Sequence, residues 1–440
     1  MKRITAENTR EVIAQHMLPD VMPIVVDLEK SRGNYIHDSR SSRQYLDVFS
    51  YIASNPLGHN HPGLSEPEFE KELLRAAKVK PSNADFYTVE MAKFVDTFAR
   101  VAMHKDLPHL FFIEGGALAV ENAMKTAFDW KVRKNLAQGA SSELGSQIAH
   151  FRQSFHGRSG YTLSVTNTRD PRKTNYFPKF DWPRISNPKI TFPLEGENLS
   201  KVIELEQQAV AELRAAFDQR APDIAAILIE PIQGEGGDNH FRPEFLSELR
   251  KLADEFEALL IFDEVQTGVG LTGTFWAFEQ LGVVPDIISF GKKTQVCGIC
   301  ASRRIDAVEH NVFQEASRIN STWGGSLVDM VRCRRYLEII EEEDLLSNVR
   351  INGKALLDGL KQIQSKYAAL FSNARGRGFM CAIDAPSEEI RNRIRKDMLD
   401  RGVLVLSCGE RSIRFRPSLT FSESDIAQLL STLEDTAKTL

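Results

Sequence analysis

Short apolar runs recur along the middle of the chain and alternate with stretches of helical periodicity. Between about residue 80 and residue 325 these runs are LFFIE (110–114), AAILIE (225–230), LLIFDEV (259–265) and DIISFG (286–291). Strands of a parallel sheet are covered by helices on both faces and therefore appear as continuous apolar runs. The alternation with helices predicts an α/β domain built on a mostly parallel sheet.

The two ends of the chain predict a second, smaller α+β unit. A short helix should precede a β meander of the runs IVVDLE, NYIHD and QYLDVF, and a helical stretch from Leu327 to about Tyr367 should precede FMCAID, VLVLSC and SIRFRP. We pair these ends into one small domain, with the large domain inserted between them. The expected boundaries are 1–75 for the N-terminal part of the small domain, 76–325 for the large domain, and 326–440 for a connecting helix and the C-terminal α+β part.

Composition excludes several classes of function. Hydrophobic residues make up 42% of the 440 residues and charged residues 26%, which is typical of a globular protein. A formal charge of −5 argues against a nucleic-acid partner. No apolar run approaches the roughly 20 residues that span a bilayer, so no membrane partner is expected. A polar N-terminus and only five cysteines predict a cytoplasmic location.

One of the apolar runs ends abruptly in two carboxylates, Asp263 and Glu264. In open α/β sheets, ligands bind at the carboxyl ends of the strands, so this pair is a candidate for a binding site. The alternative is that one of the two carboxylates only caps the segment that follows.

The next apolar run ends in Gly291, Lys292 and Lys293. Most lysines are solvated, and at least one of such a doublet is usually on the surface. A lysine at the end of a strand can also have a lowered pKa and react through its neutral amine. An acid that keeps a pyridine nitrogen protonated, paired with such a lysine, is typical of enzymes that use pyridoxal 5′-phosphate (PLP).

A third element is the Gly115-Gly116-Ala117 segment, which follows the run LFFIE and begins a strongly helical stretch. Small residues at a helix start let backbone N–H groups approach a phosphate. A Gly-Gly pair before a helix is more often a plain turn. The segment therefore indicates a phosphate site only when it is considered together with Asp263 and Lys292.

Taken together, these segments resemble the class III, ornithine-type aminotransferases of PLP fold type I. This resemblance implies PLP as the cofactor, no metal, and a large domain with a mostly parallel sheet of the seven-stranded type beside a small α+β domain. The chain departs from the family pattern at Glu114 and Gly115, where hydroxyl residues are usual, and at Lys293, where Ala or Ser is usual. The matching segments are EGGALAVENA (114–123), SFHGRSG (154–160), IEPIQGEGG (229–237), FDEVQTG (262–268), SFGKK (289–293) and NSTWGG (320–325).

The resemblance also implies roles for residues around the cofactor. Lys292 would hold PLP covalently and later carry a proton, and Asp263 would bond the pyridine nitrogen. Phe155 would stack on the ring and Gln266 would reach its phenolic oxygen. The phosphate would be held by Gly116, Ala117 and Thr322 of the partner subunit, which implies a homodimer with shared active sites.

Within the family, segments such as FGKKTQVCG (290–298) and PKFDWPRI (178–185) are most similar to members that act on the ε-amino group of L-lysine. The implied reaction is a ping-pong transamination. It takes lysine and 2-oxoglutarate to glutamate and 2-aminoadipate 6-semialdehyde, which cyclises to piperideine-6-carboxylate. Another ω-amino donor, ornithine or 4-aminobutyrate, is the alternative. A PLP-dependent regulator or a dinucleotide-binding protein without transamination is a third hypothesis.

The substrate residues follow from the same resemblance. Arg158 would clamp the α-carboxylate of lysine through two parallel hydrogen bonds. Arg414 would bind a carboxylate of 2-oxoglutarate, and Glu235 would mask this arginine while lysine is bound, because an unmasked buried arginine is costly. Asn320 and Gln266 would add further contacts to substrate or cofactor.

Four other features resemble known motifs and are set aside. Gly268 to Gly273 fits G-x-G-x-x-G, but the acid that would bind ribose is missing from the end of the next strand. Cys297 and Cys300 have no second pair and are expected to be packed and inert. His59-Asn60-His61 suggests a turn instead of a metal site. His156 is expected to have only a supporting part near the cofactor ring.

Overall fold

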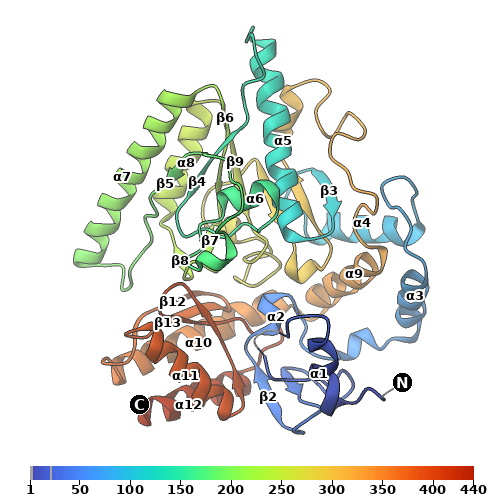
Figure 1. Ribbon diagram of the computed structural model, residues 1–440, viewed down its shortest axis with the longest axis vertical. Coiled ribbons are helices and arrows are strands. Elements are labelled where there is room, and N and C mark those ends of the chain that lie inside the picture. Colours follow the sequence, from blue (N-terminus) through green and yellow to red (C-terminus); the bar gives the residue numbers. More distant parts are fainter. Residues whose placement is uncertain (1–2, 20–21) are drawn as a thin grey trace.

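The computed structural model describes residues 3–19 and 22–440. In Figure 1 the middle of the chain forms the upper part of the molecule, and the two ends of the chain come together in the lower part. The N-terminal and C-terminal segments therefore lie in the same part of the fold, although the two chain ends are on opposite sides of it.

A seven-stranded sheet forms the centre of the upper part. Its strands pair in parallel except for one, β11, which is antiparallel to both of its neighbours. The prediction of a mostly parallel, seven-stranded sheet is thus confirmed. The strands in spatial order are β3 (His109–Ile113), β11 (Cys297–Ala301), β10 (Ile287–Phe290), β9 (Leu259–Asp263), β6 (Ile224–Ile229), β4 (Gln147–Phe151) and β5 (Arg184–Ile185).

Helices cover both faces of this sheet, which explains its apolar strands. Successive side chains of a strand point to opposite faces. On β9, Ile261 joins the cluster that includes Trp130 of α5 (Gly116–Ala137), while Phe262 joins the cluster that includes Phe245 of α8 (Pro243–Glu255). Every residue of β9 is buried as a result.

The remaining helices complete the layers around the sheet and build the lower part. The helices α9 and α10 are the pair predicted between Leu327 and Tyr367. The bounds are α1 (Thr9–Ala14), α2 (Ser50–Ala53), α3 (Pro67–Lys78), α4 (Val89–Val101), α6 (Gly160–Val165), α7 (Gly196–Arg220), α9 (Leu327–Glu342), α10 (Leu345–Lys366), α11 (Glu388–Asp400) and α12 (Glu423–Lys438), with the 3₁₀ turns η1 (Ala6–Asn8), η2 (Pro62–Leu64), η3 (Pro171–Lys173), η4 (Ala277–Gln280), η5 (Lys292–Thr294) and η6 (Arg303–Ala307).

One of the smaller sheets joins the two ends of the chain. Strand β2 pairs in parallel with β14, so the N-terminal and C-terminal segments share a three-stranded sheet. The boundaries at 75/76 and 325/326 remain a prediction. The strands are β1 (Tyr35–His37), β2 (Gln44–Asp47) and β14 (Val403–Leu404) in one sheet, β12 (Ser372–Arg377), β13 (Met380–Asp384), β16 (Ser412–Phe415) and β15 (Leu406–Cys408) in the other, and the separate pair β7 (Ile232–Gln233) and β8 (Asn239–His240).

Two of the predicted strands differ in detail from the structure. The run IVVDLE forms only a single bridge, between Val26 and Asp38, instead of a strand. The run VLVLSC is divided, because Val403–Leu404 pairs with β2 while Leu406–Cys408 pairs with β16. A continuous apolar run does not reveal that it serves two sheets.

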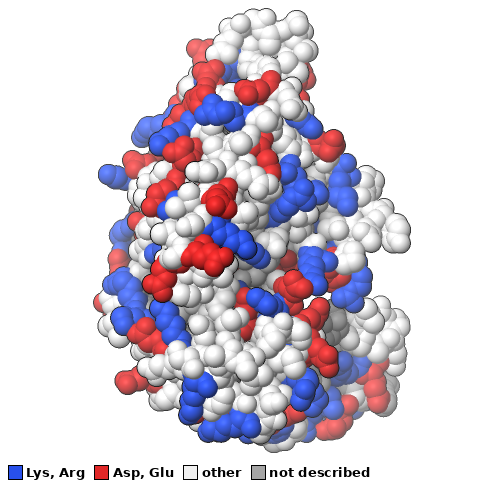
Figure 2. All heavy atoms as spheres, turned by 90° about the vertical axis from the view of Figure 1, so that its left-hand side faces the viewer, with Lys and Arg blue, Asp and Glu red and all other residues white. Residues whose placement is uncertain are grey.

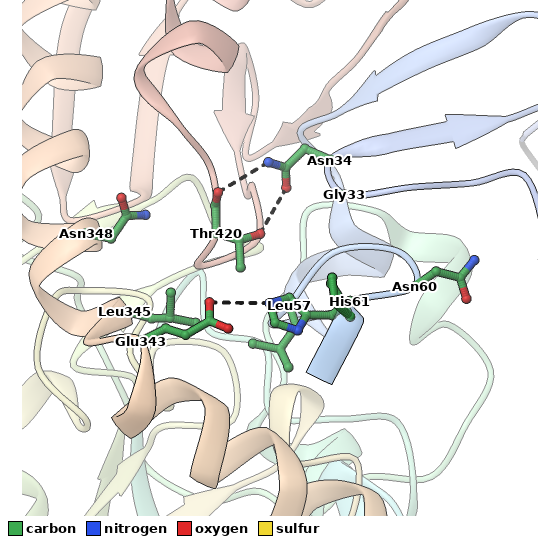
Figure 3. A pocket seen from close by; sticks show the side chains of 10 residues that line it. Gly33, Asn34, Leu57, Asn60, His61, Glu343, Leu345, Asn348 and Thr420 are labelled. Atoms are coloured by element: carbon green, nitrogen blue, oxygen red, sulfur yellow. Dashed lines mark hydrogen bonds and ion pairs between the residues drawn. The ribbon is translucent and has the colours of Figure 1, made fainter. Parts of the chain in front are cut away.

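The segments that resemble a dinucleotide site, a cysteine pair and a metal site have structural roles. No α-helix follows the 268–273 glycines before the short η4, so the geometry that a dinucleotide site requires is not formed in this described part of the chain. Cys297 and Cys300 are buried in β11, and burial raises the pKa of both thiols. His61 points toward Glu343 across a small pocket (Figure 3), at 3.4 Å.

Within the described residues, no group of three His, Cys, Asp or Glu side chains is placed to hold a metal ion. None of the described helices is both long enough and apolar enough to cross a membrane. On the face drawn in Figure 2, acidic and basic side chains are mixed, without a broad field of either sign.

Buried arginines join the small sheet to the large one. Arg416, which follows β16 and is fully buried, donates to Asp238 in the turn between β7 and β8, and Asp238 is also fully buried. Arg375 of β12 donates to the carbonyl of the same Asp238 at 2.9 Å. These contacts hold the C-terminal strands against the β7–β8 turn, which lies in the segment that follows β6 of the large sheet.

We expect Arg416→Met to destabilise the protein strongly. Removing one partner of a buried ion pair leaves an uncompensated charge and costs about 3–5 kcal/mol. The free energy of unfolding from urea titration followed by fluorescence measures this loss. Arg393→Met, at an exposed position of α11, is the matched control and should change the same quantity by less than about 0.5 kcal/mol. Equal values for the two variants would contradict the role given to Arg416.

Candidate active site

A cavity of about 300 Å³ opens where the parallel strands of the large sheet end. Its walls come from the start of α5, from the loop after β4 and from the residues that follow β6, β9 and β10. Five of the six sequence motifs found separately along the chain therefore meet at one place, and NSTWGG (320–325) does not line this cavity. The lining residues are Gly116, Ala117, Phe155, His156, Gly157, Arg158, Glu230, Asp263, Val265, Gln266 and Lys292.

The pairing of β9 with β10 brings the predicted acid and the predicted lysine together. Asp263 lies beside Ser289 in the parallel register, and Lys292 follows three residues later. Asp263 is 5% exposed, and its carboxylate accepts hydrogen bonds from the backbone N–H of Val265 and the hydroxyl of Ser289, both at 3.1 Å. The register thus fixes the carboxylate at the edge of the cavity next to Lys292.

His156 completes the environment of Asp263. Its Nδ1–H donates to Oδ2 of Asp263 at 2.7 Å, and its other ring nitrogen, Nε2, is buried without a partner among the described residues. This bond holds one carboxylate oxygen in place. The supporting part expected of His156 is consistent with this contact, although its effect on a cofactor remains a prediction.

The two lysines of the doublet have different surroundings. Lys292 has a left-handed backbone (φ 50°) and lines the cavity, and its amine makes no hydrogen bond or salt bridge to any described residue. Burial lowers the pKa of Lys292, against an opposing effect of Asp263. Its amine is therefore more easily neutral, and so more nucleophilic, than that of a surface lysine.

Lys293 has a structural position. Its ammonium group donates to the carbonyl oxygens of Gln266 and Gly268, both at 3.0 Å, and the residue is 2% exposed. The expectation that one lysine of the doublet lies on the surface is therefore wrong. Lys293 donates to two carbonyl groups of the turn after β9, and these hydrogen bonds compensate its amino group for the loss of hydration.

The start of α5 forms another wall of the cavity. Gly115 has a φ of 96°, and no side chain caps the first turn of the helix. Gly157 packs so closely that a Cβ there would lie 2.5 Å from the Cβ of Ala117. A helix start has free N–H groups and the positive end of the helix dipole, so Gly116 and Ala117 present an anion-binding site to the cavity.

The predicted substrate residues lie in two connected places. Arg158 lines the cavity, whereas Arg414 and Glu235 line an outer cleft of about 940 Å³. Gln266 lies between them, because its Oε1 accepts from Nη1 of Arg414 at 3.2 Å and from Nε of Arg416 at 3.0 Å. Burial lowers the pKa of Arg414, and its Nε is buried without a partner among the described residues.

The predicted ion pair between Glu235 and Arg414 is not formed in this structure. Oε1 of Glu235 instead accepts from the hydroxyl of Thr168 at 2.8 Å and from the ammonium group of Lys173 at 2.6 Å. Both members of the Lys173 pair are partly exposed, so forming it requires less loss of hydration than burying Glu235 against Arg414.

Asn320 and Thr322 do not line the cavity of their own chain. Both are exposed in the loop before α9, where the carbonyl of Thr322 accepts from Ser82 at 2.5 Å and the side chain of Asn320 bonds the backbone of Ser321. Their contribution to a site, including the expected one from a partner subunit, remains a prediction.

Sequence reasoning missed Glu230, which also lines the cavity. Its two carboxylate oxygens accept from the N–H groups of Phe155 at 2.8 Å and of Gly234 at 2.9 Å, and burial raises its pKa to about 7. Glu230 ends an apolar run in the same way as Asp263 does, so the same rule could have found it. The contact of Lys173 with Glu235 had no comparable signal in the sequence.

A buried lysine and a hydrogen-bonded acid at the carboxyl ends of a mostly parallel sheet, beside the start of a helix, are the features of a PLP-dependent enzyme of fold type I. The family model for aminotransferase class III matches residues 17–437, and the chain belongs to this family. It is therefore an aminotransferase that depends on PLP.

Relatives that are more than half identical to this chain are lysine enzymes. The chain is 53% identical over 423 residues to the L-lysine-epsilon aminotransferase of Mycobacterium tuberculosis, which covers 96% of this chain and 93% of the relative. It is 51% identical over 431 residues to the enzyme of that name from Amycolatopsis lactamdurans, with 97% and 95% covered. The structure of lysine aminotransferase from M. tuberculosis matches with a TM-score of 0.97, at 51% identity, over 99% of this chain and all of that one.

The residues that line the cavity match the chemical groups of PLP. The start of α5 suits a phosphate, Asp263 suits a protonated ring nitrogen, and the ring of Phe155 gives an aromatic face. The unpaired amine of Lys292 suits a covalent bond.

We expect the cofactor to be bound to Lys292 and not to Lys293. Borohydride reduction of the holoenzyme, followed by digestion and mass spectrometry, identifies the lysine that carries it. Lys292→Ala should abolish the adduct, because no other described amine lines the cavity.

Lys293→Met provides the matched control for this experiment. It should keep the adduct on Lys292 while lowering stability, because two carbonyl groups lose their donor. An adduct found on Lys293 would refute the assignment.

Proposed function

We propose that this aminotransferase transfers the ε-amino group of L-lysine to 2-oxoglutarate, giving glutamate and 2-aminoadipate 6-semialdehyde, which then cyclises to piperideine-6-carboxylate. The similarity to L-lysine-epsilon aminotransferases over nearly the whole chain carries this proposal. Arg158 in the cavity and Arg414 in the outer cleft, each able to bind a carboxylate, support it.

The proposed donor site uses Arg158. Lysine must place its ε-amino group near Lys292, which leaves its α-carboxylate at the far end of a flexible side chain. Arg158 lines the same cavity and makes no hydrogen bond or ion pair to any described residue, so its guanidinium group is free to bind a carboxylate with two hydrogen bonds. Asn320 is proposed as a further contact for substrate or cofactor.

The proposed acceptor site uses Arg414. A keto acid must present a carboxylate close to its reacting carbon, and Arg414 is buried with one nitrogen unpaired. The hydrogen bond from Arg414 to Gln266 orients its guanidinium group. A bound dicarboxylate would compensate a positive charge that is otherwise buried without a carboxylate partner among the described residues.

The chain's own residues prepare the reaction. When bound, PLP supplies an electron sink that stabilises negative charge at the carbon bearing the amino group. Lys292 would hold the cofactor and, once released, its neutral amine would take and return the proton of that carbon. Asp263, held by His156 and Ser289, would keep a proton on the ring nitrogen. Phe155 would stack on the ring, Gln266 would bond its phenolic oxygen, and Gly116 and Ala117 would bind the phosphate.

A spectrum of the holoenzyme tests this function. The visible band of bound PLP should collapse after L-lysine is added and return after 2-oxoglutarate is added. If ornithine or 4-aminobutyrate discharges the band and lysine does not, the family assignment stands and the donor is different.

The same assay tests Arg158. Arg158→Gln should lower the efficiency of the lysine half-reaction about 10- to 100-fold, because hydrogen bonds to a charged group are lost. The reaction with 1,5-diaminopentane, which lacks a carboxylate, should not change. An equal loss for both donors would rule out the carboxylate clamp.

We further propose that the active protein is a homodimer in which Thr322 of the partner subunit completes the phosphate site. Large apolar side chains near this loop support a partner surface: Phe86 is 71% exposed, Tyr87 is 82% exposed and Trp323 is 39% exposed. The loop that carries Trp323 contacts this segment, since the N–H of Asn83 donates to the carbonyl of Trp323. Exposed apolar groups of this size usually mark interfaces.

Light scattering of the holoenzyme should therefore give about twice the chain mass of 49.6 kDa. A fully active monomer would contradict the shared site.

We also propose a cytoplasmic location. Five free, buried cysteines support a reducing compartment. Cell fractionation with a cytoplasmic marker tests this, and recovery outside the cytoplasmic fraction would overturn it.

A further inference from the structure

Lys173 stands between the cavity and the outer cleft. It is the last residue of η3, whose start is fixed by Asp170, because the side chain of Asp170 accepts from the N–H of Arg172. Its ammonium group lies 2.6 Å from Oε1 of Glu235 and 5.7 Å from the centre of the Phe155 ring. Phe155 lines the cavity, and Lys173 lines the cleft together with Arg414.

Glu235 therefore lies in a cleft lined by several cationic side chains, among them Lys173 and Arg414, and its carboxylate pairs with Lys173. Thr168 donates to the same oxygen that accepts from Lys173, so two donors on one loop hold the carboxylate. Arg414 makes no hydrogen bond or ion pair with Glu235, and its guanidinium group donates to Gln266. Glu235 nevertheless acts on the charge of Arg414 from a distance, since it opposes the effect of burial on the pKa of this arginine.

We propose that Lys173 is a specificity-determining residue, which holds Glu235 away from Arg414 and so keeps Arg414 open for the carboxylate of a dicarboxylic acceptor. This inference rests on the proposed function, because it assigns Arg414 to the acceptor. Lys173 acts through Glu235 and is a positioning residue.

Whether Glu235 pairs with Lys173 or with Arg414 determines which substrate the site accepts. A carboxylate that pairs with Arg414 neutralises it, and an incoming dicarboxylate must then displace Glu235. A carboxylate that pairs with Lys173 leaves Arg414 free, so the dicarboxylate meets an available cation. Lysine brings no second carboxylate to Arg414, so its binding does not require the open state. The pair with Lys173 therefore favours the acceptor half of the reaction over the donor half.

Lys173→Met tests this role in the PLP holoenzyme. Methionine keeps the apolar stem beside Phe155 and removes the charge. Glutarate, a dicarboxylate without a keto group, binds without reacting, and isothermal titration calorimetry gives its dissociation constant. We expect this constant to rise about tenfold or more, as coupled sites typically differ by 5- to 150-fold. The KM for 2-oxoglutarate should rise in parallel, whereas kcat and the lysine half-reaction should change less than about twofold.

Matched variants separate this role from a general effect on the loop. Lys173→Arg keeps the charge and should restore glutarate binding. Lys179→Met removes a lysine from the same segment whose ammonium group, among the described residues, bonds only the carbonyl of Thr174, and it should behave as the wild type. Thr168→Val removes the other donor to Glu235 and should shift glutarate binding in the same direction as Lys173→Met.

A double-mutant cycle tests whether Lys173 acts through Glu235. With Glu235→Gln there is no carboxylate to compete for Arg414, so Lys173→Met should have no further effect on glutarate binding. If Lys173→Met leaves glutarate binding unchanged, or weakens it equally in the Glu235→Gln background, the inference is overturned.

The wild type separates failure of this inference from failure of the proposed function. A wild-type enzyme that neither binds glutarate nor recovers its PLP band with 2-oxoglutarate would overturn the acceptor assignment itself. A wild type that does both, with Lys173→Met unchanged, would overturn only the role of Lys173.

Discussion

The parallel pairing of β9 with β10 is the constraint on which the site depends. It places Asp263 opposite Ser289, and so puts a carboxylate held by three hydrogen bonds next to the strand end that carries Lys292. A shift of the register by one residue would turn Asp263 to the other face of the sheet, among the apolar side chains that pack there. The hydrophobic pattern that fixes the register therefore also places Asp263 next to Lys292.

The C-terminal strands complete the site through buried arginines. Arg414 and Arg416 both donate to Oε1 of Gln266, while Arg416 also pairs with Asp238 beneath the cleft. These cations and their acceptors are 148 to 178 residues apart in the sequence, so only the folded chain satisfies them. Stability and binding are linked here, because the charge that anchors the small sheet also orients the side chain proposed to contact the cofactor.

Much of this arrangement could be predicted from the sequence. Asp263, Lys292 and Gly116 were found because each stands at a strand end or a helix start, where a local pattern marks its position. The division of VLVLSC between two sheets, the burial of Lys293 and the partner of Glu235 could not be found in this way. They depend on which distant groups lie nearby: β2 for Val403, the carbonyls of Gln266 and Gly268 for Lys293, and Lys173 for Glu235.

The position of Glu235 shows why a family resemblance does not predict the ion-pair partner of such a residue. The motif IEPIQGEGG identifies a carboxylate near the substrate, but the motif contains no information about which cation the carboxylate meets. In this structure the cation is Lys173 of η3, a short turn whose sequence, PRK, resembles many surface turns. Two chains with the same motif and a different turn would share the fold and the cofactor, and they would differ in how readily Arg414 is available. Differences in acceptor preference within the family are therefore expected to arise outside the motifs that define it.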